Sequence, residues 1–102
     1  MKYRERARWG LTTDECRYIY SICQLYEMQD VRIQNKIQNV LSEVSNRYAS
    51  STHEIKLRRS ALWMCLSTKS DQLAVATEFY LDQSTVSRMV KEFYKLFKKK
   101  YL

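Results

Sequence analysis

One short run near the C-terminus, QSTVSR at residues 83–88, holds the side chains best suited to reading DNA bases. Glutamine can form a pair of hydrogen bonds with adenine, arginine can form a pair with guanine, and serine or threonine can bond to bases or phosphates. If the run is helical and Val86 turns inward with Met89 and Val90, the polar residues around it turn outward. The predicted outward, base-reading set is Gln83, Ser84, Thr85, Ser87, Arg88 and Lys91.

The residues around this run have the spacing of a helix-turn-helix. Such a unit needs a small residue where the second helix crosses the first, and a large apolar residue about three positions later. It also needs an apolar residue that returns from the second helix to the same core. Ala76, Phe79 and Val86 fill these positions. The pattern predicts a helix-turn-helix at about residues 70–98, with a recognition helix at about 83–97.

Tyr80 occupies the turn position where most helix-turn-helix units have glycine, and Leu81 follows it as the apolar residue of the turn. That position often takes a left-handed backbone conformation, which is costly for a bulky side chain. The sequence therefore predicts either a wider turn or a strained Tyr80.

The net charge of +7 is concentrated at the two ends of the chain. Residues 1–10 contain four basic and one acidic side chain, and residues 85–102 contain six basic and one acidic. Ends of this kind favour contact with a polyanion, although they can also serve only to keep a protein in solution. The predicted phosphate contacts are Lys69, Lys95, Lys98, Lys99 and Lys100.

Apolar residues recur along the rest of the chain at three- and four-residue steps, the period of an α-helix. Thr12 with Glu15 and Ser51 with Glu54 have the spacing of capping boxes, while Asp30, Ser70 and Asp82 can cap further helices. The chain has one glycine and no proline, which disfavours a turn-rich, strand-rich fold. The prediction is one all-α domain over residues 1–102, with about five helices, at about 13–28, from Asp30 to Tyr48, at 52–67, from Ser70 to Phe79 and from Asp82 onward.

Few residues suggest any chemistry other than binding. Cys16, Cys23 and Cys65 have no CxxC spacing and His53 is the only histidine, so no zinc site is expected and the thiols are predicted to be reduced. No catalytic motif or acid–base pair is recognisable, so the chain is expected to be neither an enzyme nor a cofactor binder.

Aromatic residues of the first half (Tyr18, Tyr20, Tyr26 and Tyr48) could stack on the bases of a single strand, but their helical spacing favours packing. Trp9, beside a basic segment, could anchor an arm in a minor groove. A loosely packed N-terminus is the simpler expectation.

The segment QSTVSRMV is similar to recognition helices of many bacterial, plasmid and phage regulators. Over residues 73–97 the chain resembles the KorA/TrfB-type plasmid repressors, which have glycine at the Tyr80 position. Over about residues 55–97 its layout resembles the PapB-type regulators of fimbrial adhesin operons, small all-helical proteins without that glycine. This resemblance implies an oligomeric transcription regulator that binds operator DNA, with residues 83–88 at the base-reading surface.

The sequence thus predicts a sequence-specific, double-stranded DNA-binding transcriptional regulator that reads the major groove. It is expected to be cytoplasmic and nucleoid-associated, with no membrane-spanning segment and no evident small-molecule substrate. A homodimer or higher homo-oligomer is expected because one recognition helix seldom gives enough base contacts. Two alternatives stay open: a helical adaptor that docks on RNA polymerase or on a phage or plasmid assembly, and a DNA-packaging or replication-initiation factor.

Overall fold

The computed structural model describes residues 9–68 and 70–102, and the described chain is all-helical. This confirms the predicted all-α class with about five helices. The elements are α2 (Thr13–Gln24), the short 3-10 helix η1 (Tyr26–Met28), α3 (Val31–Arg47), α4 (Thr52–Ser67), α5 (Gln72–Glu78) and α6 (Gln83–Tyr101).

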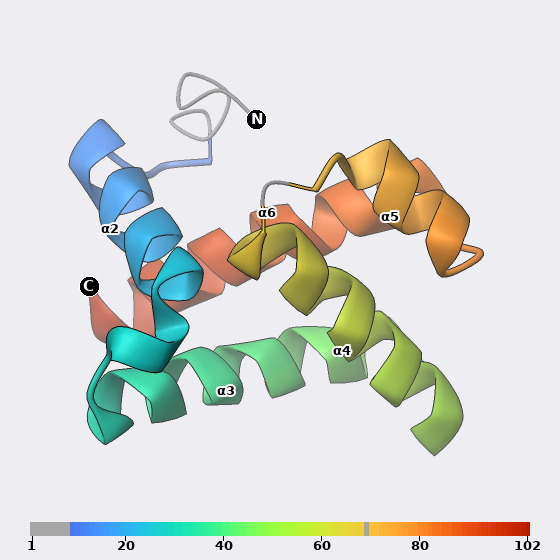
Figure 1. Cartoon of the computed structure of the whole chain (residues 1–102), viewed down its shortest axis with the longest axis horizontal. Helices are drawn as coiled ribbons and strands as arrows, with labels where there is room; N and C mark the ends of the chain where they lie inside the picture. The colour runs from blue at the N-terminus through green and yellow to red at the C-terminus, as the bar shows by residue number, and fades with distance from the viewer. Residues whose placement is uncertain (1–8, 69) are drawn as a thin grey trace.

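The C-terminal helix α6 is the central element of the fold. It packs against α2, α3, α4 and α5, and Figure 1 shows it crossing the molecule behind α4. α3 runs antiparallel to it, because Asn39 in the middle of α3 reaches Tyr101 while Arg47 at its end reaches Glu92. The predicted inward residues of α6 are all buried, together with Tyr94 and Leu96: Val86, Met89, Val90, Phe93 and Phe97.

Capping explains where most helices begin. Thr12 and Glu15 form the predicted capping box, with bonds of 3.1 Å and 2.7 Å in the two directions, and Asp30 caps α3. The predicted Ser51–Glu54 box forms only in one direction. Ser51 caps α4, but the Glu54 carboxylate accepts a hydrogen bond from the Ser50 hydroxyl.

Three predicted boundaries differ from the structure. The first helix ends at Gln24 and continues only as η1. The cap of α5 is Asp71, not Ser70. Asp82 precedes α6 as expected, but its side chain makes no capping bond.

The turn between α5 and α6 is tight, and Tyr80 takes the left-handed conformation with φ +56°. The Leu81 N–H donates to the carbonyl of Ala76 at 2.8 Å, and the Tyr80 N–H donates to that of Thr77 at 3.4 Å. This pair of bonds is the Schellman closure of a helix, which places a left-handed residue at the Tyr80 position. Of the two predictions for the turn, the strained Tyr80 is therefore the correct one.

The Tyr80 ring is stabilised little by contacts with the rest of the protein, since 96% of the residue is exposed. We therefore expect Tyr80→Gly to raise the free energy of unfolding by roughly 0.5–1 kcal/mol, because glycine takes a left-handed conformation without steric cost. Urea denaturation measures the change. Ala74→Gly, in the exposed middle of α5, is the control and should lower stability by about 1 kcal/mol. A destabilised Tyr80→Gly variant would show that the ring supports the fold.

Candidate nucleic-acid interface

The outward face of α6 carries four basic side chains in a single line. Arg88, Lys91, Lys95 and Lys99 follow one another at three- and four-residue steps, and all four are exposed. At 1.5 Å per residue this line is about 16 Å long. We call these four residues the α6 cationic stripe. Ser84 extends the same line toward the start of the helix.

The stripe differs from the neighbouring Lys98 and Lys100 in making no close ion pair, although the charge of Lys99 helps to lower the pKa of Glu43. Among the described residues, none of its four side chains forms an ion pair or a hydrogen bond within the chain. By contrast, Lys98 contacts Glu15 at 3.1 Å and donates to the Gly10 carbonyl at 2.6 Å. Lys100 contacts Glu43 at 2.8 Å. The charge that is free to meet an external anion is therefore concentrated on the stripe.

The structure thus separates the predicted phosphate contacts into two groups. Lys95 and Lys99 belong to the stripe. Lys98 connects α6 to α2 and to Gly10 before it, and Lys100 connects α6 to α3. Lys69 lies outside the described residues. Removing Lys98 or Lys100 would change stability as well as surface charge, so only Lys95 and Lys99 give a clean test of phosphate contact.

The base-reading set is also divided. Gln83, Ser84 and Arg88 are exposed, and Thr85 is half-buried. Ser87 is half-buried, and its hydroxyl donates to the Gln72 Oε1 atom at 2.6 Å, which fastens the start of α5 to α6. Lys91 is exposed as a member of the stripe, so the side chains of this set that can reach a ligand freely are Gln83, Ser84, Arg88 and Lys91.

Acidic side chains lie at both ends of α5 and directly before α6. Asp71, Glu78 and Asp82 are exposed, and none forms an ion pair among the described residues. Their charges oppose a phosphate group at the N-terminus of α6, where the helix dipole alone would attract one. This arrangement places the attraction for an anion along the stripe, from Arg88 onward.

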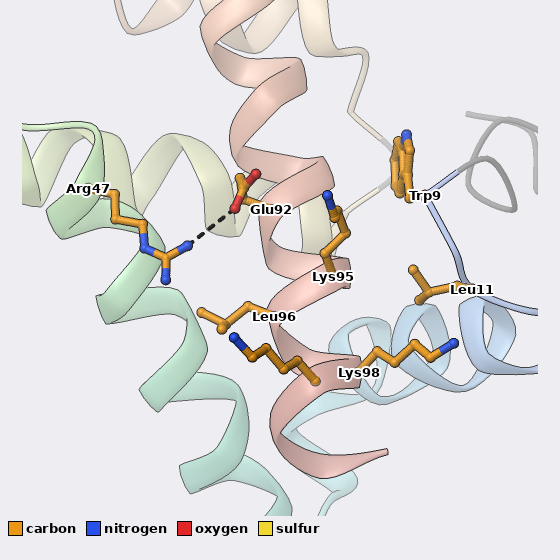
Figure 2. A pocket seen from close by; sticks show the side chains of 8 residues that line it. Trp9, Leu11, Arg47, Glu92, Lys95, Leu96 and Lys98 are labelled. Atoms are coloured by element: carbon orange, nitrogen blue, oxygen red, sulfur yellow. Dashed lines mark hydrogen bonds and ion pairs between the residues drawn. The ribbon is translucent and has the colours of Figure 1, made fainter.

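A hollow of about 370 Å³ lies over the C-terminal half of the stripe. Figure 2 shows Lys95 in front of α6, with Trp9 and Leu11 on one side of the helix and Arg47 on the other. Leu96 and Lys99 also line it. Because Lys95 and Lys99 are one helical turn apart, the sequence alone could have predicted that they lie on the same face of α6. No local pattern in the sequence predicted that Trp9 and Arg47 lie beside them.

The ion pairs beside the stripe shift the pKa values of Glu15, Glu43 and Lys100. A hydrogen bond from the Thr12 N–H lowers the pKa of Glu15, and a bond from Lys98 lowers it further. The bond with Lys100 lowers the pKa of Glu43, and the same contact raises the pKa of Lys100. These shifts favour the charged forms, so both lysines are held in place at neutral pH.

Because the folded-state pKa of Glu15 is depressed, its ionised form adds stability at neutral pH that is lost as the pH falls through the folded pKa. Glu15→Gln removes this titration, so the variant should lose less stability than the wild type between pH 7 and pH 3. The stability that Lys98→Met loses over this pH range should lie between the losses of Glu15→Gln and of the wild type. Denaturation at both pH values measures this, and an unchanged loss in Glu15→Gln would contradict the assignment.

No disulfide joins the three cysteines among the described residues, and Cys16 and Cys23 lie in the core. Burial raises the pKa of the half-buried Cys65 thiol to about 11, and the charge of Asp71 adds to the effect. At neutral pH Cys65 is therefore a protonated thiol, which is a poor nucleophile and a poor metal ligand.

The aromatic residues pack inside the molecule to different extents. Tyr26 contacts Trp63 edge-on with centroids 5.1 Å apart, and Trp9 contacts the buried Tyr94 at 5.7 Å. Tyr48 is half-buried, whereas Tyr18 is exposed. The predicted packing role therefore holds for Tyr26 and in part for Tyr48. Of the N-terminal segment, only Trp9 and Gly10 lie within the described residues, and Trp9 is anchored on α6.

None of the described helices combines the length and the apolar character that crossing a lipid bilayer requires. No family model, no curated protein and no solved structure matches this chain. The similarity to helix-turn-helix regulators therefore remains a prediction from the sequence, and the function has to be argued from the geometry of α6.

Proposed function

We propose that this chain binds double-stranded DNA through the outward face of α6 and acts as a transcriptional regulator. The observation that supports this most strongly is the α6 cationic stripe, whose four basic side chains are exposed and form no close ion pair among the described residues. A duplex presents closely spaced phosphates, and lysine and arginine are the side chains that neutralise them.

Base reading is assigned to the exposed polar residues at the start of α6. Gln83 and Arg88 can each form paired hydrogen bonds with a base edge, and Ser84 lies on the line between them and the stripe. The tight α5–α6 turn keeps these residues at one end of the helix, where a major groove would receive them. The stripe would then follow the phosphates beyond the groove.

The direct test is fluorescence anisotropy with labelled duplexes recovered from genomic fragments, measured over a range of salt concentrations. Three phosphate contacts, made by Lys91, Lys95 and Lys99, predict that log Kobs falls with log salt with a slope of about −3. Sequencing the retained fragments then shows whether they are promoters. An absence of binding at micromolar protein and low salt would refute DNA binding.

Self-association is part of the proposal, because two recognition helices read two half-sites and so give useful specificity. The best available surface is at η1, where the apolar residues Leu25, Met28 and Val31 follow one another at three-residue steps and are all exposed. Sedimentation equilibrium at micromolar concentration, with and without DNA, measures the association. A protein that stays monomeric under both conditions would exclude the dimer.

One observation favours the adaptor alternative. Leu73 and Tyr80 are exposed apolar residues on α5 and the turn. The exposed Asp71, Glu78 and Asp82 each lie within two residues of one of them in the sequence. An acidic surface with apolar residues suits a basic protein partner better than it suits DNA. In that case substitutions in the stripe would leave partner binding unchanged, whereas Tyr80→Gly would weaken it.

A further inference from the structure

We propose that the hollow over the C-terminal half of α6 is a binding site for a nucleoside monophosphate, with the phosphate between Lys95 and Lys99 and the base against Trp9. Its volume of about 370 Å³ lies within the range of small-molecule sites. Nucleotide binding in this hollow does not require the chain to bind DNA.

Two lysines of the α6 cationic stripe, Lys95 and Lys99, line the hollow. Lys95 and Lys99 are one helical turn apart, which places their Cβ atoms about 5–6 Å from each other. Both line the hollow, and neither forms an ion pair or a hydrogen bond among the described residues. The other cations of the lining are already matched, since Arg47 lies 3.2 Å from Glu92 and Lys98 lies 3.1 Å from Glu15.

The excess charge of the hollow indicates the kind of phosphate. With Arg47 and Lys98 matched by carboxylates, two positive charges remain, those of Lys95 and Lys99. A phosphate monoester carries a charge of about −1.5 to −2 at neutral pH, whereas each phosphodiester of a DNA backbone carries −1. The monoester therefore matches the hollow more closely.

An aromatic wall stands beside these lysines. The Trp9 ring packs edge-on against the buried Tyr94, with an interplanar angle of 61°, so the core fixes its orientation. Trp9 remains partly exposed, and it lies beside Lys95 in Figure 2. Bases stack on aromatic side chains of every type, and Leu11 and Leu96 add apolar surface below.

The test uses Trp9 as the reporter. Trp63→Phe leaves Trp9 as the single tryptophan. Titration of this variant with adenosine monophosphate should give a saturable change in fluorescence. Adenosine and inorganic phosphate, tested separately, should each bind at least about 10-fold more weakly, because each makes only part of the contacts. If Trp63→Phe fails to fold, calorimetric titration of the wild type gives the same comparison.

Matched variants separate a site from general attraction to a basic surface. Lys95→Met and Lys99→Met should each weaken binding by about 10-fold. Lys91→Met is the control, because Lys91 belongs to the stripe but does not line the hollow, and its affinity should stay within about twofold. Equal losses in all three variants, or no saturable change at millimolar nucleotide, would overturn the proposal.

Measurements with duplex DNA distinguish the nucleotide site from the proposed DNA binding. If the chain also binds DNA, saturating nucleotide should lower its affinity for a duplex, because both ligands use Lys95 and Lys99. A chain that binds nucleotide but no duplex would refute the proposed function alone. A chain that binds duplex but no nucleotide would refute the hollow as a nucleotide site.

Discussion

Reversing the charge of Lys91 and Lys95 together is expected to lower the affinity for duplex DNA by roughly 100-fold or more at low salt. Each lysine would neutralise a phosphate on binding and release its counterion, and a glutamate at the same place would repel that phosphate. The slope of log Kobs against log salt should become shallower by about 2, since about one unit is lost for each contact removed. Anisotropy measurements on one duplex give both quantities.

The control for this prediction must change the net charge by the same amount elsewhere. Arg32 is on α3 and Lys56 is on α4, and both are exposed. The double variant Arg32→Glu, Lys56→Glu has the same net charge as the stripe variant. We expect it to lose only the small part of the affinity that depends on overall charge. Equal losses in the two double variants would show that the stripe has no special role.

Folding should not complicate the comparison. Lys91 and Lys95 are exposed and make no ion pair among the described residues, so their replacement should change the free energy of unfolding by no more than about 0.5 kcal/mol. Lys98 and Lys100 would be worse choices, because their contacts with Glu15 and Glu43 connect separate elements. A variant of either would mix a loss of stability with a loss of charge.

The sequence was sufficient to predict the elements that have strong local signals. The apolar period of α6 predicted its buried face correctly, and the Thr12–Glu15 box predicted the start of α2. Both depend on residues within a few positions of one another. The predicted end of the first helix was wrong because the apolar stripe continues through Tyr26 into η1. Periodicity alone cannot distinguish two such short helices from one longer helix.

The candidate site was predicted less completely because part of it depends on contacts between distant segments. Ser87 has the type and position of a base-reading residue, but Gln72 on α5 occupies its hydroxyl. The pairing of Lys98 with Glu15 and of Lys100 with Glu43 likewise follows from how α6 packs on its neighbours. A basic run in a sequence gives the number of charges but does not show which of them have counterions.

Arg88→Ala is expected to lower the affinity for a cognate operator by about 1–3 kcal/mol while leaving the affinity for random duplex nearly unchanged. Arg88 is the one member of the stripe near the start of α6 whose side chain can form two bonds to a guanine edge. If those bonds are made to a base, their loss affects one sequence, and substitution of that base pair should cause no further loss in the variant.

Lys99→Ala provides the comparison that makes the Arg88 result decisive. Lys99 lies at the far end of the stripe, about 16 Å along the helix, so it should contact phosphate and weaken binding to every duplex by a similar factor. The two variants remove the same charge from the same face of α6 and differ only in position. An equal loss on cognate and random DNA from Arg88→Ala would assign Arg88 to the phosphates, and base reading would then have to come from Gln83 and Ser84.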